Sequence, residues 1–300
     1  ARGPVTYVAL ARPARARPMS FAPGQSLDRY TIEALLGEGG MGTVYRAFDR
    51  RLQRHVALKV LRFSQDEDAA SAVAGALREA RAAAAITHPS VTAVFDAGEI
   101  EGTAFIAQEL VRGATLRALL GAGLPPLPTR VRWLMEIAAG LAAGHRAGVV
   151  HRDVKPENVI IRDDARAKVV DFGIARRTRA ASSHDIHGSL DSGTPSFVGA
   201  PRGTPAYMSP EQIRDERVDG RSDQFSWGVL AHELLTGRLP WKRAKDFLGY
   251  LGAVLTEEVD APSRLAPEIP AALDTVVLRA LCKQPEQRFA SMSEIPALLA

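Results

Sequence analysis

The most informative stretch of this sequence is His151-Arg152-Asp153-Val154-Lys155-Pro156-Glu157-Asn158-Val159-Ile160-Ile161. Its polar and charged side chains lie between two short apolar runs, as in a loop held between buried segments. A surface loop would explain the charge but not this order of residue types. Phosphoryl transfer requires a carboxylate that accepts the hydroxyl proton, a cation near the transferring phosphate and an oxygen ligand for a metal ion. Asp153, Lys155 and Asn158 offer these groups in turn.

A second acidic motif, Asp171-Phe172-Gly173, follows the strand predicted at residues 167–170. Taken alone, these three residues are also compatible with a simple turn. Placed after the first loop, Asp171 offers a carboxylate for Mg²⁺ bound to phosphates. Because Mg²⁺ prefers hard oxygen ligands, Asp171 and Asn158 together with phosphate oxygens would form a chemically sensible shell. No Cys/His spacing typical of a zinc site competes with it.

A glycine cluster, Gly37-Glu38-Gly39-Gly40-Met41-Gly42, lies nearer the N-terminus. Glycines let backbone amides approach phosphate oxygens closely. Such a cluster can also be a tight turn, or the dinucleotide-binding fingerprint, which requires a helix immediately afterwards. Here the β-prone run 44–48 follows instead. The context therefore favours a strand–turn–strand flap over nucleotide phosphates and excludes a dinucleotide-dependent oxidoreductase.

Lys59 is the only charge in the apolar strand predicted at residues 56–61. A lysine in a strand is commonly a solvent-facing edge residue. Its distance after the glycine cluster also suits an ammonium held against phosphates, and such a lysine needs an anion to orient it. Glu79, on the helix predicted at 69–86, is the preferred partner. The acidic residues 66–68 crowd the start of that helix, where carboxylates often complement the helix dipole.

The predicted elements divide the chain into a strand-rich part and a larger helical part. Strands are predicted within 30–61, at 92–95 and at 104–110, and helices at 69–86, 130–146, 222–235, 271–283 and 291–299. We therefore expect an α+β fold with two lobes that join near residues 110–113. The expected organisation is a flexible Pro/Arg/Ala-rich extension at 1–27, a first lobe at 28–110 and a second lobe at 111–300.

The composition fits a globular protein, with 46% hydrophobic and 24% charged residues. The formal net charge is +4 and the basic residues are spread along the chain, so we expect no nucleic-acid partner. The single cysteine, Cys282, forms no intrachain disulfide, and no apolar run is long enough for a membrane span. We expect a cytoplasmic catalytic segment without membrane contact, and the sequence leaves open whether further domains or a membrane anchor follow Ala300 in the native protein.

The motifs and their order over about residues 28–300 resemble those of protein kinases, and most closely the eukaryotic-like serine/threonine kinases of bacteria. The resemblance implies a bilobal kinase fold with a small β-rich lobe, one regulatory helix and a larger helical lobe. It implies transfer of the γ-phosphate of ATP to Ser/Thr hydroxyls of proteins, with Mg²⁺ as cofactor and Mn²⁺ as a substitute. Lys155 and Gly203-Thr204 resemble the serine/threonine branch rather than the tyrosine branch.

The resemblance also assigns roles to individual residues. It implies Asp153 as catalytic base, Lys155 on the γ-phosphate, Lys59 paired with Glu79, and Asn158 and Asp171 on the metal. It places ATP under Gly37, Glu38, Gly39, Gly40, Met41, Gly42 and Val44, its adenine between Val44, Ala57 and Ile160, and hinge hydrogen bonds at Glu109 and Val111. It makes Asp223 the residue that ties down the catalytic loop and Glu211–Arg288 a structural ion pair.

An activation segment is expected at 171–211, with Thr194 and Ser196 as candidate autophosphorylation sites held by Arg152. Each of them is equally well explained as a polar loop residue. Two departures from the family pattern stand out. Ser209 replaces the usual alanine before Pro210-Glu211, and Gln108 at the gatekeeper position is more polar than usual, which puts inhibitor preference in doubt.

Two other functions are compatible with this fold. A catalytically silent, ATP-binding pseudokinase scaffold would have lost Lys59, Asp153, Asn158 or Asp171, and all four are present. A small-molecule kinase generally lacks the segment found here at 203–211. The sequence leaves open the protein substrate and whether a homodimer forms through the small lobe.

Overall fold

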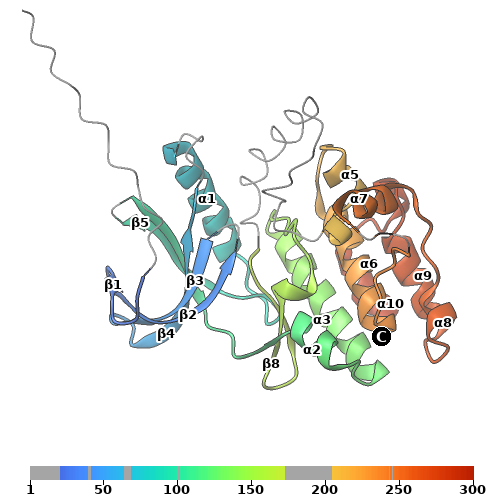
Figure 1. Cartoon of the computed structure of the whole chain (residues 1–300), viewed down its shortest axis with the longest axis horizontal. Helices are drawn as coiled ribbons and strands as arrows, with labels where there is room; N and C mark the ends of the chain where they lie inside the picture. Colours follow the sequence, from blue (N-terminus) through green and yellow to red (C-terminus); the bar gives the residue numbers. More distant parts are fainter. Residues whose placement is uncertain are drawn as a thin grey trace, which may run out of the picture.

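The computed structural model describes residues 21–39, 42–63, 69–100, 102–172, 205–242, 244 and 246–300. A strand-rich lobe with helix α1 lies on one side, and the helices from α3 onward form the other lobe (Figure 1). The α+β, two-lobed fold class expected from the sequence is therefore confirmed. Within the described residues, no helix is both long and apolar enough to span a membrane.

The small lobe is built on an antiparallel sheet with the strand order β1-β2-β3-β4-β6-β5. Its inner face buries alternate side chains of β3 and most of β4. Helix α1 packs against β5 and β6 through residues spaced three or four apart, Val73, Ala76 and Ala80. The elements are β1 (Ser26–Leu27), β2 (Tyr30–Gly39), β3 (Gly42–Asp49), β4 (Arg54–Leu61), α1 (Ala69–Ala84), β5 (Val94–Ile100) and β6 (Thr103–Glu109).

The large lobe surrounds α6, which is buried over nearly its whole length and packs on α3 and α9. Asp219 caps the start of α6, and Gly237 ends it in the left-handed conformation, with φ +74°. The helices are α2 (Leu116–Ala122), α3 (Leu127–Arg146), α5 (Pro210–Ile213), α6 (Gly220–Thr236), α7 (Phe247–Thr256), α8 (Pro262–Leu265), α9 (Ala271–Ala280) and α10 (Ile295–Leu299).

A small antiparallel sheet, β7-β8-β9, lies where the two lobes meet. Its strands flank the loop segments that carry the polar motifs. They are β7 (Gly113–Thr115), β8 (Val159–Arg162) and β9 (Ala167–Val169), and the short 3₁₀ turns are η1 (Pro156–Asn158), η2 (Pro205–Tyr207), η3 (Pro285–Gln287) and η4 (Met292–Glu294).

Most predicted elements end within three residues of the observed bounds, and two elements differ more, for physical reasons. The strand predicted at 92–95 instead spans Val94–Ile100, because pairing with β6 continues to a tight hairpin at Ile100↔Thr103. The helix predicted at 291–299 is divided into η4 and α10, since Pro296 stands at the start of the second helix.

Lys283, just after α9, is packed in an aromatic environment. Its ammonium lies 4.6 Å from the centroid of the Trp241 ring and donates a hydrogen bond of 2.8 Å to the Val254 carbonyl. Burial lowers the pKa of Lys283 from 10.5 to about 8, although Glu257 acts in the opposite direction. The unfolded chain therefore binds this proton more tightly, so the free energy of unfolding rises with pH between about 8 and 10.5 and the penalty is complete below pH 8.

We expect Lys283→Met to raise the free energy of unfolding at pH 7 by about 1 kcal/mol, because the desolvation penalty, reduced by partial solvent exposure, exceeds the lost cation–π contact and hydrogen bond to Val254. The advantage over the unsubstituted protein should shrink as pH approaches 10.5. Urea unfolding of both proteins at pH 7 and pH 10 measures this difference in the free energy of unfolding. Lys242→Met is the matched control, because Lys242 is 54% exposed. A pH-independent difference for Lys283→Met would contradict the expectation.

Candidate active site

The glycine cluster forms the tip of the β2–β3 hairpin, with Gly39 opposite Gly42 and Gly37 opposite Val44. Gly42 has φ +145°, and a Cβ atom there would lie 2.0 Å from the Val60 carbonyl oxygen, so only glycine fits. Gly37 and Gly39 have no atom within 4 Å of the place a Cβ would take, which leaves their backbone open to a ligand. Gly40 and Met41 lie outside the described residues.

Lys59 points from β4 toward the start of the Asp171 motif in the large lobe. Its side chain is only 5% exposed, and Nζ lies 2.9 Å from Asp171 Oδ2. Burial opposes ionisation of the Asp171 carboxyl, but the Lys59 ammonium outweighs it and holds the pKa of that carboxyl below its usual range. A charged pair thus connects the two lobes. The expected pairing of Lys59 with Glu79 on α1 stays a prediction.

The Asp171 carboxylate fits a cation site. Among the residues that the structure describes, the buried Oδ1 has no hydrogen-bond partner, whereas Oδ2 is bound to Lys59. A buried carboxylate oxygen without a donor is costly unless it meets a positive ligand. Asp171 also has φ +63°, a left-handed conformation that is uncommon for a non-glycine residue and is often retained at functional sites.

The loop 151–158 brings its three proposed functional side chains together. Oδ2 of Asp153 lies 2.8 Å from Lys155 Nζ and accepts a hydrogen bond of 3.0 Å from Asn158 Nδ2. Nδ2 of Asn158 also donates to the Asp153 carbonyl, at 2.7 Å. The Asp153 side chain remains 35% exposed, so its carboxylate is held in one direction yet stays accessible.

Asp223, near the start of α6, supports this loop from beneath. Its fully buried carboxylate accepts hydrogen bonds from the amides of His151 and Arg152, both at 2.8 Å, and contacts His145 Nε2 at 2.7 Å. Burial opposes its ionisation, but the hydrogen bond from His145 outweighs it and lowers the pKa of Asp223. The arrangement matches the loop-anchoring position predicted for Asp223.

Backbone contacts join the 151–158 loop to the Asp171 motif. Val170 N donates to the Asn158 carbonyl at 3.0 Å, and His151 Nε2 donates to the Val170 carbonyl at 2.9 Å. Nδ1 of the same imidazole accepts from Asp153 N at 3.2 Å, so the ring is a neutral tautomer placed between the two motifs. The groups predicted to act together, from Lys59 through Asp171 to Asp153, therefore lie around one region.

Phe172 fixes the position of Asp171 from the apolar side. Its ring packs edge-on against His151, with the ring centroids 4.8 Å apart. On its other side the ring touches α3 at Gly144, where a Cβ atom would lie 2.3 Å from Phe172 Cε1. Glycine at this position allows the aromatic ring to approach the helix backbone.

The residues expected around adenine lie on both sheets. Val44 is opposite Lys59, Ala57 is opposite Gln108, and Ile160 lies on β8. Glu109 ends β6, where its amide donates to the Ala93 carbonyl at 2.9 Å, and Val111 follows in the connection to β7. The Glu109 carboxylate is bound by Lys168 Nζ at 2.5 and 2.6 Å, an ion pair between β6 and β9 that sequence reasoning missed.

Arg117 at the start of α2 forms another contact that the sequence did not reveal. Its guanidinium contacts Glu157 at 2.8 Å, Glu233 at 2.6 Å and the Tyr207 hydroxyl at 2.5 Å. It therefore links η1 in the loop, α6 and the η2 turn. A single arginine in a short helix shows no spacing pattern, so only a pairing of charges across the fold could identify it.

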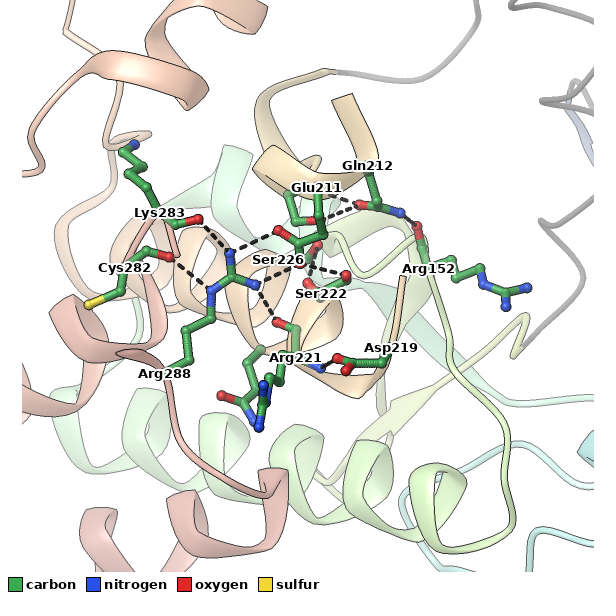
Figure 2. A network of polar contacts seen from close by, with 12 residues as sticks. Arg152, Glu211, Gln212, Asp219, Arg221, Ser222, Ser226, Cys282, Lys283 and Arg288 are labelled. Atoms are coloured by element: carbon green, nitrogen blue, oxygen red, sulfur yellow. Dashed lines mark hydrogen bonds and ion pairs between the residues drawn. The ribbon is translucent and has the colours of Figure 1, made fainter. Parts of the chain in front are cut away.

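The end of the expected activation segment is anchored by α5, as Figure 2 shows. Arg288 binds Glu211 through both guanidinium ends, at 2.7 and 2.9 Å, and Ser222 Oγ donates to the same carboxylate at 2.6 Å. Burial opposes ionisation of Glu211, but the Arg288 hydrogen bond outweighs it and lowers the pKa of Glu211. The predicted ion pair is therefore present. Residues 173–204, including the candidate sites Thr194 and Ser196, lie outside the described residues.

Comparisons with known proteins agree with this geometry. The family model described as the protein kinase domain matches residues 30–297. A probable serine/threonine-protein kinase of Streptomyces coelicolor, SCO3848, is 42% identical over 278 residues, which cover 89% of this chain and 39% of that protein. The serine/threonine-protein kinase PknL of Mycobacterium tuberculosis is 40% identical over 266 residues, covering 88% of this chain and 63% of PknL.

A solved structure shows the same architecture. The crystal structure of the Mycobacterium tuberculosis PknI kinase domain aligns with a TM-score of 0.71 and 28% sequence identity, covering 93% of this chain and 98% of that one. The chain thus spans only part of the length of the two curated relatives, while it matches nearly the whole of a solved kinase domain. The resemblance inferred from the motifs is confirmed, and the chain belongs to the protein kinase domain family.

Proposed function

We propose that this domain is the catalytic part of a serine/threonine protein kinase that transfers the γ-phosphate of ATP to Ser/Thr hydroxyls of proteins. The observation that carries the proposal is the ion pair between Lys59 and Asp171, in backbone contact with the loop of Asp153 through Val170. The names of its relatives and the presence of all four groups whose loss would mark a pseudokinase point the same way.

Each residue has a proposed task that its surroundings suit. Lys59 would hold the α- and β-phosphates, because its buried ammonium already selects an anion. Asp171 and Asn158 would hold a divalent cation, for which Mg²⁺ is the proposed choice and Mn²⁺ a substitute. Asp171 Oδ1, which has no donor within the described part of the chain, fits that role. Bound there, the cation would neutralise charge on the phosphates.

Asp153 would orient the substrate hydroxyl and accept its proton. Its carboxylate is held through Oδ2 by Lys155 and Asn158, which leaves the accessible part of the group to face a substrate. Lys155 would contact the transferring phosphate, moving from its present ion pair. Glu79 would orient Lys59. The exposed glycines of the β2–β3 hairpin would cover the phosphates, and Val44, Ala57 and Ile160 would contact adenine, with Glu109 and Val111 at the hinge.

Label transfer from γ-labelled ATP to a generic protein and to the chain itself tests the proposal. With Mg²⁺, we expect phosphoserine and phosphothreonine without phosphotyrosine. Excess EDTA should abolish the signal, because the metal-binding groups would lose their cation, and added Mg²⁺ should restore it. Phosphopeptide mapping would show whether Thr194 and Ser196 carry the label. Absence of protein labelling despite bound nucleotide would contradict the proposal.

A further inference from the structure

Arg152, directly before Asp153, has a backbone that must be held on both sides. Its φ is +68°, in the left-handed region that non-glycine residues rarely adopt. On the amide side, Arg152 N donates to Asp223 Oδ1 at 2.8 Å. On the carbonyl side, Gln212 Nε2 donates to Arg152 O at 2.9 Å. Both backbone polar groups of Arg152 thus have a partner, and the N–H of the peptide between Arg152 and Asp153 donates to His151 Nδ1 at 3.2 Å.

Gln212 belongs to α5 and uses both ends of its side-chain amide (Figure 2). Its Oε1 accepts from Ser209 N at 3.0 Å, whereas its Nε2 faces the Arg152 carbonyl. These partners determine the orientation of the Gln212 side-chain amide. Its oxygen must face the Ser209 N–H, which is a donor, and its NH₂ group must face the Arg152 carbonyl, which is an acceptor. A carboxylate at this position would keep the first contact and lose the second.

The platform that carries Gln212 is rigid. The neighbouring Glu211 is buried and bound by Arg288 and Ser222, which fixes α5 to the start of α6 and to the segment after α9. Asp223 lies on the same helix α6. The partners of the Arg152 N–H and of the Arg152 carbonyl are therefore held by one framework, and a hydrogen bond from such a framework can set the direction of the next residue.

We propose that Gln212 is a positioning residue for the phosphoryl transfer. By holding the Arg152 carbonyl, it fixes the peptide between Arg152 and Asp153 and thereby the direction of the Asp153 carboxylate. This inference rests on the proposed role of Asp153 as catalytic base. It predicts a loss in kcat and little change in the KM for ATP, because Gln212 contacts Ser209 and Arg152 and none of the expected ATP contacts involves it.

Gln212→Glu is the decisive variant, because it keeps an acceptor for Ser209 N but removes the donor for Arg152 O. We expect kcat to fall about 10- to 100-fold, with the KM for ATP within about twofold. Hydrogen exchange of amides in residues 151–155 should become faster. Wild-type kcat in this variant would overturn the inference, and so would an equal loss of ATP affinity.

A matched control separates positioning from helix capping. At η4, Glu294 Oε1 accepts from Ser291 N at 2.8 Å, the same cap contact as in α5 but without a link to the 151–158 loop. Gln212→Ala and Glu294→Ala each remove one such cap. Only Gln212→Ala should lower kcat when both are assayed at temperatures where they are folded. Equal kcat losses would assign the effect to stability and overturn the inference.

The outcome also separates this inference from the proposed function. If Asp153→Asn is inactive while Gln212→Glu retains wild-type kcat, Asp153 has its proposed role and Gln212 does not. If Asp153→Asn remains fully active, the proposed base itself is wrong and the inference fails with it.

Discussion

Asp153→Asn is expected to lower kcat about 10²- to 10⁴-fold, the range associated with removal of a general base. The amide has nearly the same shape but accepts protons poorly, so the loss should fall on the chemical step. The contacts from Lys155 and Asn158 both meet Oδ2 of Asp153 and are compatible with an amide oxygen there. The thermal midpoint and the affinity for ATP should therefore change little, which calorimetry and nucleotide titration would measure beside label transfer.

Asp164→Asn is the matched control for this variant. Asp164 lies in the turn between β8 and β9 and forms an exposed pair with Arg162 at 3.0 Å. Exposed pairs contribute only about 0–1 kcal/mol, and Asp164 has no proposed chemical role. Its variant should retain wild-type kcat. Equal label incorporation by Asp153→Asn and the unsubstituted protein would mean that the role of base is misassigned.

Arg288→Met is expected to lower the free energy of unfolding by about 3–5 kcal/mol, as when one partner of a buried ion pair is removed. The Arg288 side chain is 0% exposed and binds the Glu211 carboxylate as well as the carbonyls of Cys282 and Arg221, both at 2.8 Å. Methionine fills much of the space but donates no hydrogen bond. It leaves a buried carboxylate and the carbonyls of Cys282, Arg221 and Lys283 without this donor, so the thermal midpoint should fall by roughly 10 °C.

The double variant Glu211→Gln/Arg288→Met tests whether the cost comes from the stranded charge. Removing the charge of Glu211 should return part of the lost stability, so the double variant should be more stable than Arg288→Met. Arg162→Met serves as the control because its pair with Asp164 is exposed on both sides, at 39% and 48%. A shift for Arg288→Met no larger than that of Arg162→Met would contradict the expectation.

The fold and the main polar motifs could be predicted because their signals are local. Asp153, Lys155 and Asn158 lie within one short loop, so their order alone indicates their chemistry, and the structure brings them into contact. The alternating strands and the helical lobe follow from apolar periodicity, which depends on neighbours in the sequence. Strand ends were less accurate, as at Val94–Ile100, because pairing with β6 decides where β5 stops.

The contacts that escaped prediction join residues with no common pattern. Arg117 on α2 meets Glu157, Glu233 and Tyr207, which lie on three other elements, and Lys168 meets Glu109 across two sheets. Each residue alone is an ordinary surface type, and only the tertiary fold determines its partner. The link from Gln212 to Arg152 is of the same kind. Spacing in a sequence can indicate which groups are present, but not which distant pairs meet.

The close approach of Phe172 to Gly144 makes position 144 sensitive to mutation. A single added methyl group on α3 would occupy the place of the ring, since it would lie 2.3 Å from Phe172 Cε1. The ring would have to shift and carry its neighbour Asp171 away from Lys59. Gly144→Ala alters no polar atom and leaves every sequence motif intact. It would nevertheless displace Asp171 from its contact with Lys59.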